Sequence, residues 1–223
     1  MFCGCHSLKK LDVSGLDTSH VVNMEGMFYW CSKLQTLDVS YFDTSHVINM
    51  KSMFDYCSSL KKLDLSSFCT KHVIDFSSMF GECIQLEKLV LSGWDTKSAV
   101  YMRGMFENCR SLRMLDVLSF DTKNVINMEW MFKGCKSLKN LELSNFNTSK
   151  VKTMEAMFCA CGNLEQLDIS KFDIKANCVL EEMFAEFSAN GVVRINQKAK
   201  KAIENNGGSD SSYVKHWEIV DEK

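Results

Sequence analysis

The 223-residue sequence contains no proline, and several features that mark common protein classes are also missing. Proline removes a backbone donor from any hydrogen-bonded array, so its absence is compatible with a continuous stack of strands. No apolar run approaches the about 20 residues that cross a bilayer. The formal net charge is only −2, so no global positive field attracts nucleic acid or an anionic membrane. We therefore expect no nucleic-acid partner and no membrane insertion.

Motifs of common catalytic sites are absent as well. The chain has no glycine-rich phosphate loop, no G-x-S-x-G and no H-E-x-x-H. A composition that is 46% hydrophobic and 24% charged is nevertheless typical of a folded protein. We expect a non-enzymatic protein without catalytic residues, cofactor or bound metal.

The chain consists mainly of a 26-residue repeat, which recurs without insertion or deletion from the start to about residue 184. A Met-Phe pair recurs at this period from Met27-Phe28 to Met183-Phe184. Three further columns keep the same spacing: Leu8, Leu34, Leu60, Leu86, Leu112, Leu138 and Leu164; Leu11, Leu37, Leu63, Leu89, Leu115, Leu141 and Leu167; and Cys5, Cys31, Cys57, Cys83, Cys109, Cys135 and Cys161. Such strictness predicts a solenoid of about seven coils, because an extra residue would shift a whole coil out of register.

Each repeat begins with the pattern L-x-x-L-x-L-x-x-F, which is typical of a leucine-rich-repeat strand. The fold class that follows is a leucine-rich-repeat-like solenoid, with parallel strands on one face and short helix or turn segments on the other. The strands are expected near residues 8–13, 34–39, 60–65, 86–91, 112–117, 138–143 and 164–169.

The second half of each repeat permits two interpretations. Apolar residues from Val47 to Cys57 lie mostly three or four apart, which favours a short helical segment. A second short strand at Val47–Met50, followed by one helical turn at Ser52–Tyr56, fits almost as well. We favour the second interpretation because β-branched residues suit strands.

The repeat motif L-x-x-L-D-x-S-x-F-D-T-S-x-V-x-x-M-x-x-M-F-x-x-C resembles the BspA-like bacterial surface-protein repeat in its 26-residue form. The resemblance covers residues 1 to about 186. It implies a leucine-rich-repeat surface protein, mostly bacterial, that adheres to host or matrix proteins. It also implies a location at the cell surface or outside the cell. The first ten residues, MFCGCHSLKK, lack the apolar core of a signal peptide, so a cytoplasmic location is the alternative.

The two ends are expected to differ. Residues 1–186 form the solenoid, and residues 187–223 form a C-terminal cap with a strand at Val192–Ile195, a helix at Gln197–Asn206, a stop at Asn206-Gly207-Gly208 and a final strand at Tyr213–Val220. Met1-Phe2 is in phase with the internal Met-Phe pairs, so the first coil is expected to expose a strand edge. Self-association through this edge is a possible consequence.

Four polar or thiol columns are candidate sites. The cysteine column is interpreted as buried, reduced core thiols, and the Asp-Thr pairs at the corners as turn caps. His20, His46 and His72 share one phase and are interpreted as exposed decoration rather than a metal site. The carboxylates of the strand face are the candidate partner-binding residues, although their structural alternative is stabilisation by nearby cations and serines such as Ser14 and Ser40: Asp12, Asp38, Asp64, Asp116, Glu142 and Asp168.

We therefore expect a non-catalytic module that presents a repetitive surface to a protein, an extracellular-matrix component or another host-surface macromolecule. The alternative is an intracellular protein-protein interaction scaffold, which the many unpaired thiols favour.

Overall fold

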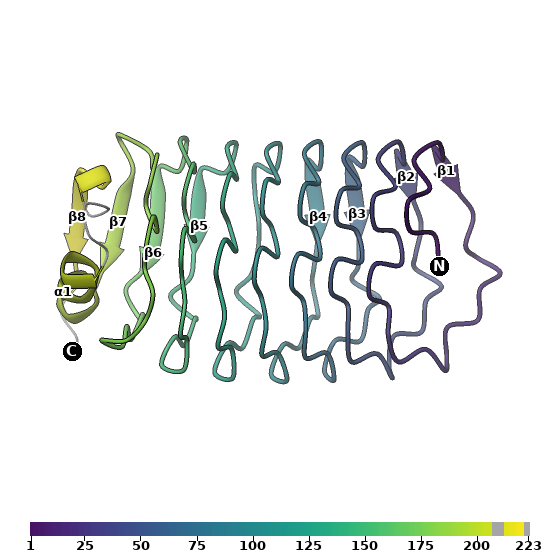
Figure 1. Cartoon of the computed structure of the whole chain (residues 1–223), viewed down its shortest axis with the longest axis horizontal. Coiled ribbons are helices and arrows are strands. Elements are labelled where there is room, and N and C mark those ends of the chain that lie inside the picture. Colours follow the sequence, from purple (N-terminus) through teal and green to yellow (C-terminus); the bar gives the residue numbers. More distant parts are fainter. Residues whose placement is uncertain (207–211, 221–223) are drawn as a thin grey trace.

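The computed structural model describes residues 1–206 and 212–220 and shows a parallel β-solenoid of about eight turns. The coils lie side by side along one axis, with the N-terminus near one end and the C-terminal helix and strand at the other (Figure 1). The predicted class, a repeat solenoid with a 26-residue coil, is confirmed. The expected seven coils become about eight because Val192 pairs with Gln166, which is also 26 residues earlier.

Short parallel strands form one side of each coil, called here the strand side. Their order along the rod is β1-β2, then β3-β4, then β5-β6-β7-β8. Equivalent residues of successive repeats pair directly, as Leu63 of β3 does with Leu89 of β4. The strands are β1 (Lys10–Leu11), β2 (Thr36–Leu37), β3 (Lys62–Asp64), β4 (Lys88–Val90), β5 (Asn140–Glu142), β6 (Gln166–Ile169), β7 (Val192–Ile195) and β8 (His216–Ile219).

The strand expected at 112–117 does not form, and the other strands are shorter than expected. No backbone hydrogen bond joins residues 113–117 to a neighbouring coil on this side, although all residues involved are described. The segment is held instead by the burial of Leu112 and Val117 in the core. The strand side is therefore interrupted between β4 and β5.

The opposite half of the coil contains no helix anywhere in residues 1–186, so the helical interpretation of 47–57 is wrong. The alternative is half right. A one-residue parallel bridge forms at Asn49, and equivalent bridges run from Asn23 to Val179. The expected helical turn at Ser52–Tyr56 is a series of tight turns, in which Ser52 and Tyr56 have positive φ values of 52° and 60°.

These turns, called here the turn side (residues 51–57 and their equivalents), have an unusual hydrogen-bond pattern. The amides of Ser52, Phe54 and Tyr56 all donate to carbonyls of the next coil at 2.8–2.9 Å. The intervening amides donate locally to the third residue back, as Asp55 does to Ser52. Because the inter-coil bonds all point the same way, this side differs from a β-ladder, in which donors alternate in direction.

Side chains from all sides fill one continuous core. The phenylalanines of the Met-Phe pairs stack along the axis with ring centroids 5.5–5.9 Å apart, from Phe28 to Phe184. The cysteine column is buried beside them from Cys31 to Cys161, and all eleven cysteines are free. Each thiol of this column donates to a phenylalanine carbonyl of the preceding coil, as Cys83 does to Phe54 at 3.2 Å. The predicted core role of these thiols is confirmed.

The C-terminal elements extend the stack. Strand β7 and the helix α1 (Gln197–Asn206) form where the sequence predicts them, and β8 lies inside the predicted 213–220. Trp217 packs edge-on against Phe184 with the centroids 5.8 Å apart. Gly207 and Gly208 of the predicted stop lie outside the described residues.

Candidate functional site

The six carboxylates of the strand side lie in one row along the rod, and each of them accepts a hydrogen bond from its own chain. Asp38, for example, accepts the amide of Ser40 at 2.9 Å, and Glu142 accepts the amide of Ser144 at the same distance. The backbone amide two residues downstream donates the same bond to Asp12, Asp64, Asp116 and Asp168. This side-chain-to-backbone bond caps the turn that ends each strand.

The capping bond also affects the charge of these groups. The backbone amide of Ser40, together with the hydroxyl of the same serine, holds the pKa of the Asp38 carboxyl below its usual value. Asp12 and Asp64 show the same direction for the same reason, with Ser14 and Ser66 as partners. These carboxylates therefore remain ionised and exposed at neutral pH while they stabilise the turn.

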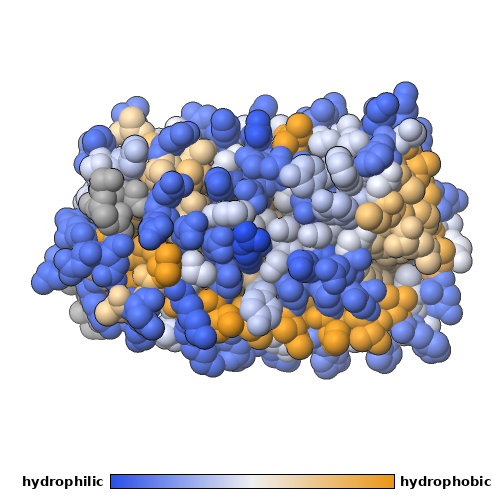
Figure 2. All heavy atoms as spheres, viewed as in Figure 1, coloured by the Kyte–Doolittle hydropathy of each residue, from blue (hydrophilic) through white to orange (hydrophobic). Residues whose placement is uncertain are grey.

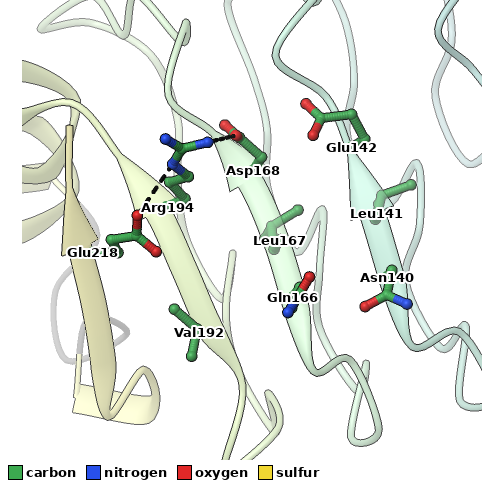
Figure 3. A pocket seen from close by; sticks show the side chains of 9 residues that line it. All are labelled: Asn140, Leu141, Glu142, Gln166, Leu167, Asp168, Val192, Arg194 and Glu218. Carbon is green, nitrogen blue, oxygen red and sulfur yellow. Dashed lines mark hydrogen bonds and ion pairs between the residues drawn. The ribbon is translucent and has the colours of Figure 1, made fainter.

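At the C-terminal end, the strand side becomes a shallow cavity of about 350 Å³ over β5 to β8. Figure 3 shows Arg194 of β7 between Asp168 of β6 and Glu218 of β8. The guanidinium is 3.3 Å from the Asp168 carboxylate and 3.2 Å from the Glu218 carboxylate. One cation thus offsets two acids, and Asp168 differs from the other candidate carboxylates in having an ionic partner.

An apolar surface lies near the middle of the strand side, where the ladder is interrupted. We call Met114, Leu115 and Leu118 the apolar island. Met114 is 82% exposed and Leu118 is 57% exposed. Together with charged residues from β4 and β5 they line a groove of about 760 Å³.

Sequence reasoning missed this island, although the repeat alignment contains the signal. The position of Met114 is lysine, threonine, asparagine or glutamine in the coils from Lys10 to Gln166. The position of Leu118 is serine in every other coil from Ser14 to Ser170. Two outward-facing polar positions have thus become apolar in a single coil, beside the break in the ladder.

The remaining candidate columns are explained by local structure. Corner residues such as Asp43 accept the amide two residues downstream, which confirms the predicted turn caps. His20, His46 and His72 are exposed, as predicted. Within residues 1–206 and 212–220, no group of three or more histidine, cysteine or carboxylate side chains has the geometry of a metal site. Over the same ranges, no helix has the length and apolar character needed to span a bilayer.

The surface as a whole is broad and shallow. In the view of Figure 2, hydrophilic residues cover most of the molecule, and apolar residues gather in patches along one long edge and near the N-terminal end. The cavity over β5 to β8 and the groove beside the apolar island are both partly open to solvent.

Comparison with known protein families gives a match over most of the chain. The model of a family described as "Mycoplasma protein of unknown function, DUF285" matches residues 1–115 and, a second time, residues 101–205. The two matches together span nearly the whole solenoid. No curated protein matches the chain.

Proposed function

We propose that this chain, which belongs to the Mycoplasma family of unknown function DUF285, is a non-catalytic binding module that presents its strand side to a protein or matrix partner. The repeat motif is similar to that of BspA-like surface proteins, and this supports adhesion at the cell surface as its role. A solenoid of stacked coils offers an extended surface rather than an enclosed site, which suits a macromolecular partner.

The observation that carries the proposal is the exposed apolar island. A side chain such as Met114, 82% exposed where the other coils from Lys10 to Gln166 have polar residues, contributes nothing to the core of its own coil. Interface centres are rich in methionine and poor in charged residues, whereas the rim is polar and accessible to solvent. Asp116 and Glu142 border the same groove and fit that rim.

The test restores the residues that the other coils carry. The variant Met114→Lys/Leu118→Ser is compared with the native chain as bait for extracellular-matrix proteins and host-cell surface extracts. We expect a partner retained by the native chain to be lost by the variant, while the two unfold at nearly the same temperature. Tyr41→Ser, which removes another exposed large side chain, is the matched control and should retain the partner. Equal retention by the native chain and the double variant would place the binding surface elsewhere.

The role of the carboxylates is tested separately. Charge reversal at Asp38 and Asp64 would also remove the bonds to Ser40 and Ser66 that cap their turns. Asparagine keeps an oxygen acceptor and removes the charge, so Asp38→Asn/Asp64→Asn isolates the electrostatic part. We expect weaker binding of the same partner and an unchanged fold. Unchanged affinity would limit these two residues to their structural role.

An intracellular scaffold is the second candidate, and the eleven free cysteines favour it. Unpaired thiols are typical of reducing compartments. The same bait experiment with a cytosolic extract distinguishes the two functions, because only the scaffold should retain a cytosolic partner through the apolar island.

A further inference from the structure

Three aromatic side chains form an exposed cluster on the turn side, near the N-terminal end of the rod. The rings of Tyr29, Trp30 and Tyr56 lie with their centroids 6.0–6.2 Å apart and are steeply inclined to one another. His6 packs edge-on against Trp30 at 4.8 Å. Trp30 is 49% exposed and Tyr56 is 41% exposed, so ring surface remains open to solvent. This cluster lies on a different side of the coil from the apolar island.

Two carboxylates adjoin this cluster toward the C-terminal end: Glu82 is half-buried, and Asp55 is buried with 8% of its surface exposed. Asp55 immediately precedes Tyr56, and Glu82 occupies the position of Tyr56 in the next coil. Asp55 accepts a hydrogen bond from the hydroxyl of Ser52 at 3.2 Å, and Glu82 accepts one from the side-chain amide of Asn108 at 2.7 Å. Both partners are neutral, so these bonds leave the negative charge uncompensated.

No ion pair of the described residues includes this group, although burial raises the pKa of Glu107 and the charges of Lys133 and Arg103 partly oppose that rise. The ten ion pairs of residues 1–206 and 212–220 include neither Asp55, Glu82 nor Glu107. Burial raises the pKa of Asp55 to about 7, and the charges of Glu82 and Glu107 contribute to this rise. The three acids therefore act on one another, and a positive charge from outside would relieve their repulsion.

The same side of the solenoid shows what such a charge does when the chain supplies it. Farther along the rod, the guanidinium of Arg103 lies 4.2 Å from the centre of the Trp130 ring, and the ammonium of Lys133 lies 4.8 Å from it. Arg103 also pairs with the carboxylate of Glu129 at 3.1 Å. An aromatic ring and a carboxylate thus hold cations from the chain itself in that part of the rod.

The backbone adds to the preference for cations. On the turn side every inter-coil amide donates toward the C-terminal end, as Ser52 does to Ser77. The aligned peptide dipoles have their negative pole at the N-terminal end, where the aromatic cluster lies. This field has the same sign as the field of the carboxylates.

We propose that Trp30, Tyr56 and Glu82 form a second binding site, which takes the ammonium or guanidinium side chains of a basic peptide segment in a partner protein. The cation lies over the faces of the rings, and the carboxylates provide the opposing charge. The half-buried acids Glu82 and Glu107 belong to successive coils, whose backbones are about 5 Å apart, so a segment with several positive charges fits better than a single small cation. The site does not depend on the function proposed for the strand side.

The experiment is calorimetric titration of the full chain at low ionic strength with tri-arginine and tri-lysine peptides, with tetramethylammonium and with tri-glutamate. We expect the basic peptides to bind, more weakly as salt is added, and tri-glutamate not to bind. Glu82→Gln and Trp30→Leu should each weaken the basic peptides about fivefold or more, which is within the range of a partly desolvated cation–π contact or charge pair. Glu181→Gln makes the same charge change on an exposed residue at the far end of the turn side and should leave the affinity unchanged.

The outcomes are decisive in both directions. Equal losses for Glu82→Gln and Glu181→Gln would mean that only the net charge matters, and the site would be refuted. Tetramethylammonium that binds as tightly as the peptides would refute the peptide as the ligand. Thermal unfolding of each variant shows whether the variant has kept its fold. Met114→Lys/Leu118→Ser should bind the basic peptides normally, so failure of this site is distinguishable from failure of the strand-side proposal.

Discussion

The hydroxyl of Thr122 makes two hydrogen bonds to Asn147 in the next coil. It accepts the amide of Asn147 at 2.8 Å and donates to the carbonyl of the same residue at 3.0 Å. The same pair of hydrogen bonds joins Thr18 to Asp43, Thr44 to Cys69, Thr70 to Asp95 and Thr96 to Asp121. A buried column of threonines thus connects the coils at the corner, where the backbone has no strand pairing.

Thr122→Val should destabilise the solenoid by about 1–3 kcal/mol, because it leaves a backbone amide and carbonyl of Asn147 without their partner in a partly buried corner. Denaturant unfolding of the purified chain measures the change. Thr153→Val is the control, since the Thr153 hydroxyl accepts only one long bond of 3.3 Å, from Glu155. A similar small loss in both variants would show that the corner bonds contribute little.

Gly134→Ala should also lower stability. Gly134 has a φ of +71°, and a Cβ there would lie 2.2 Å from the side-chain oxygen of Asn108. The left-handed backbone alone costs a residue with a Cβ about 1–2 kcal/mol, and displacement of Asn108 breaks its bond to Glu82. Gly162→Ala is the matched control, because a Cβ there meets no atom within 4 Å. Thermal unfolding should separate the two variants, and Asn108→Ala should recover part of the loss in Gly134→Ala.

The thiols of the buried cysteine column should react hardly at all with alkylating reagents in the folded protein. Burial raises the pKa of the Cys83 thiol far above its ordinary value, so hardly any thiolate is present at pH 8. Cys3 is exposed. Alkylation followed by peptide mass spectrometry should find Cys3 modified within minutes, and Cys83 modified only in denaturant. Equal rates at the two positions in native buffer would contradict the buried ladder.

Stability should depend on pH through Asp55. Its pKa is raised to about 7 in the folded chain, mainly by burial, from an ordinary value near 3.8. The folded state therefore binds the proton more tightly than the unfolded state, so the stability associated with the protonated form is lost as pH rises from about 4 to 7. Asp55→Asn, which keeps an acceptor for Ser52, should be more stable than the native chain at pH 8, by up to roughly 4 kcal/mol at 1.36 kcal/mol per pKa unit. The difference should disappear near pH 4. Parallel urea titrations at the two pH values would show it, and a difference independent of pH would exclude this origin.

The coil period and most strand positions were predictable because one inserted residue would disrupt every neighbour. The same logic located Val192–Ile195 and α1 correctly. The turn side was not predictable from periodicity. Met50, Met53, Phe54 and Cys57 have helical spacing, but the amides of Met50 and Phe54 donate to the next coil. The left-handed conformations at Ser52 and Tyr56 occur at residues other than glycine, so the sequence does not indicate them.

For the candidate site, periodicity was informative mainly where it failed. The regular carboxylate column was easy to see, and its capping bonds to residues such as Ser40 are local. Met114 and Leu118 were visible only as departures from otherwise polar columns. The missing ladder bonds beside them depend on small displacements between coils, which the sequence pattern does not encode.

The inter-coil hydrogen bonds run along the long axis of the rod, and this has a mechanical consequence. Tension applied to the two chain ends stretches these bonds along their length. The terminal coil is loaded first, because the pull reaches the rod through the chain end that this coil carries. That coil can peel away while the others keep their contacts. Each released coil lengthens the molecule by about 90 Å, because 26 residues extend at about 3.5 Å each. The solenoid can therefore unfold under force one coil at a time, in steps of equal length, and refold onto the coils that remain.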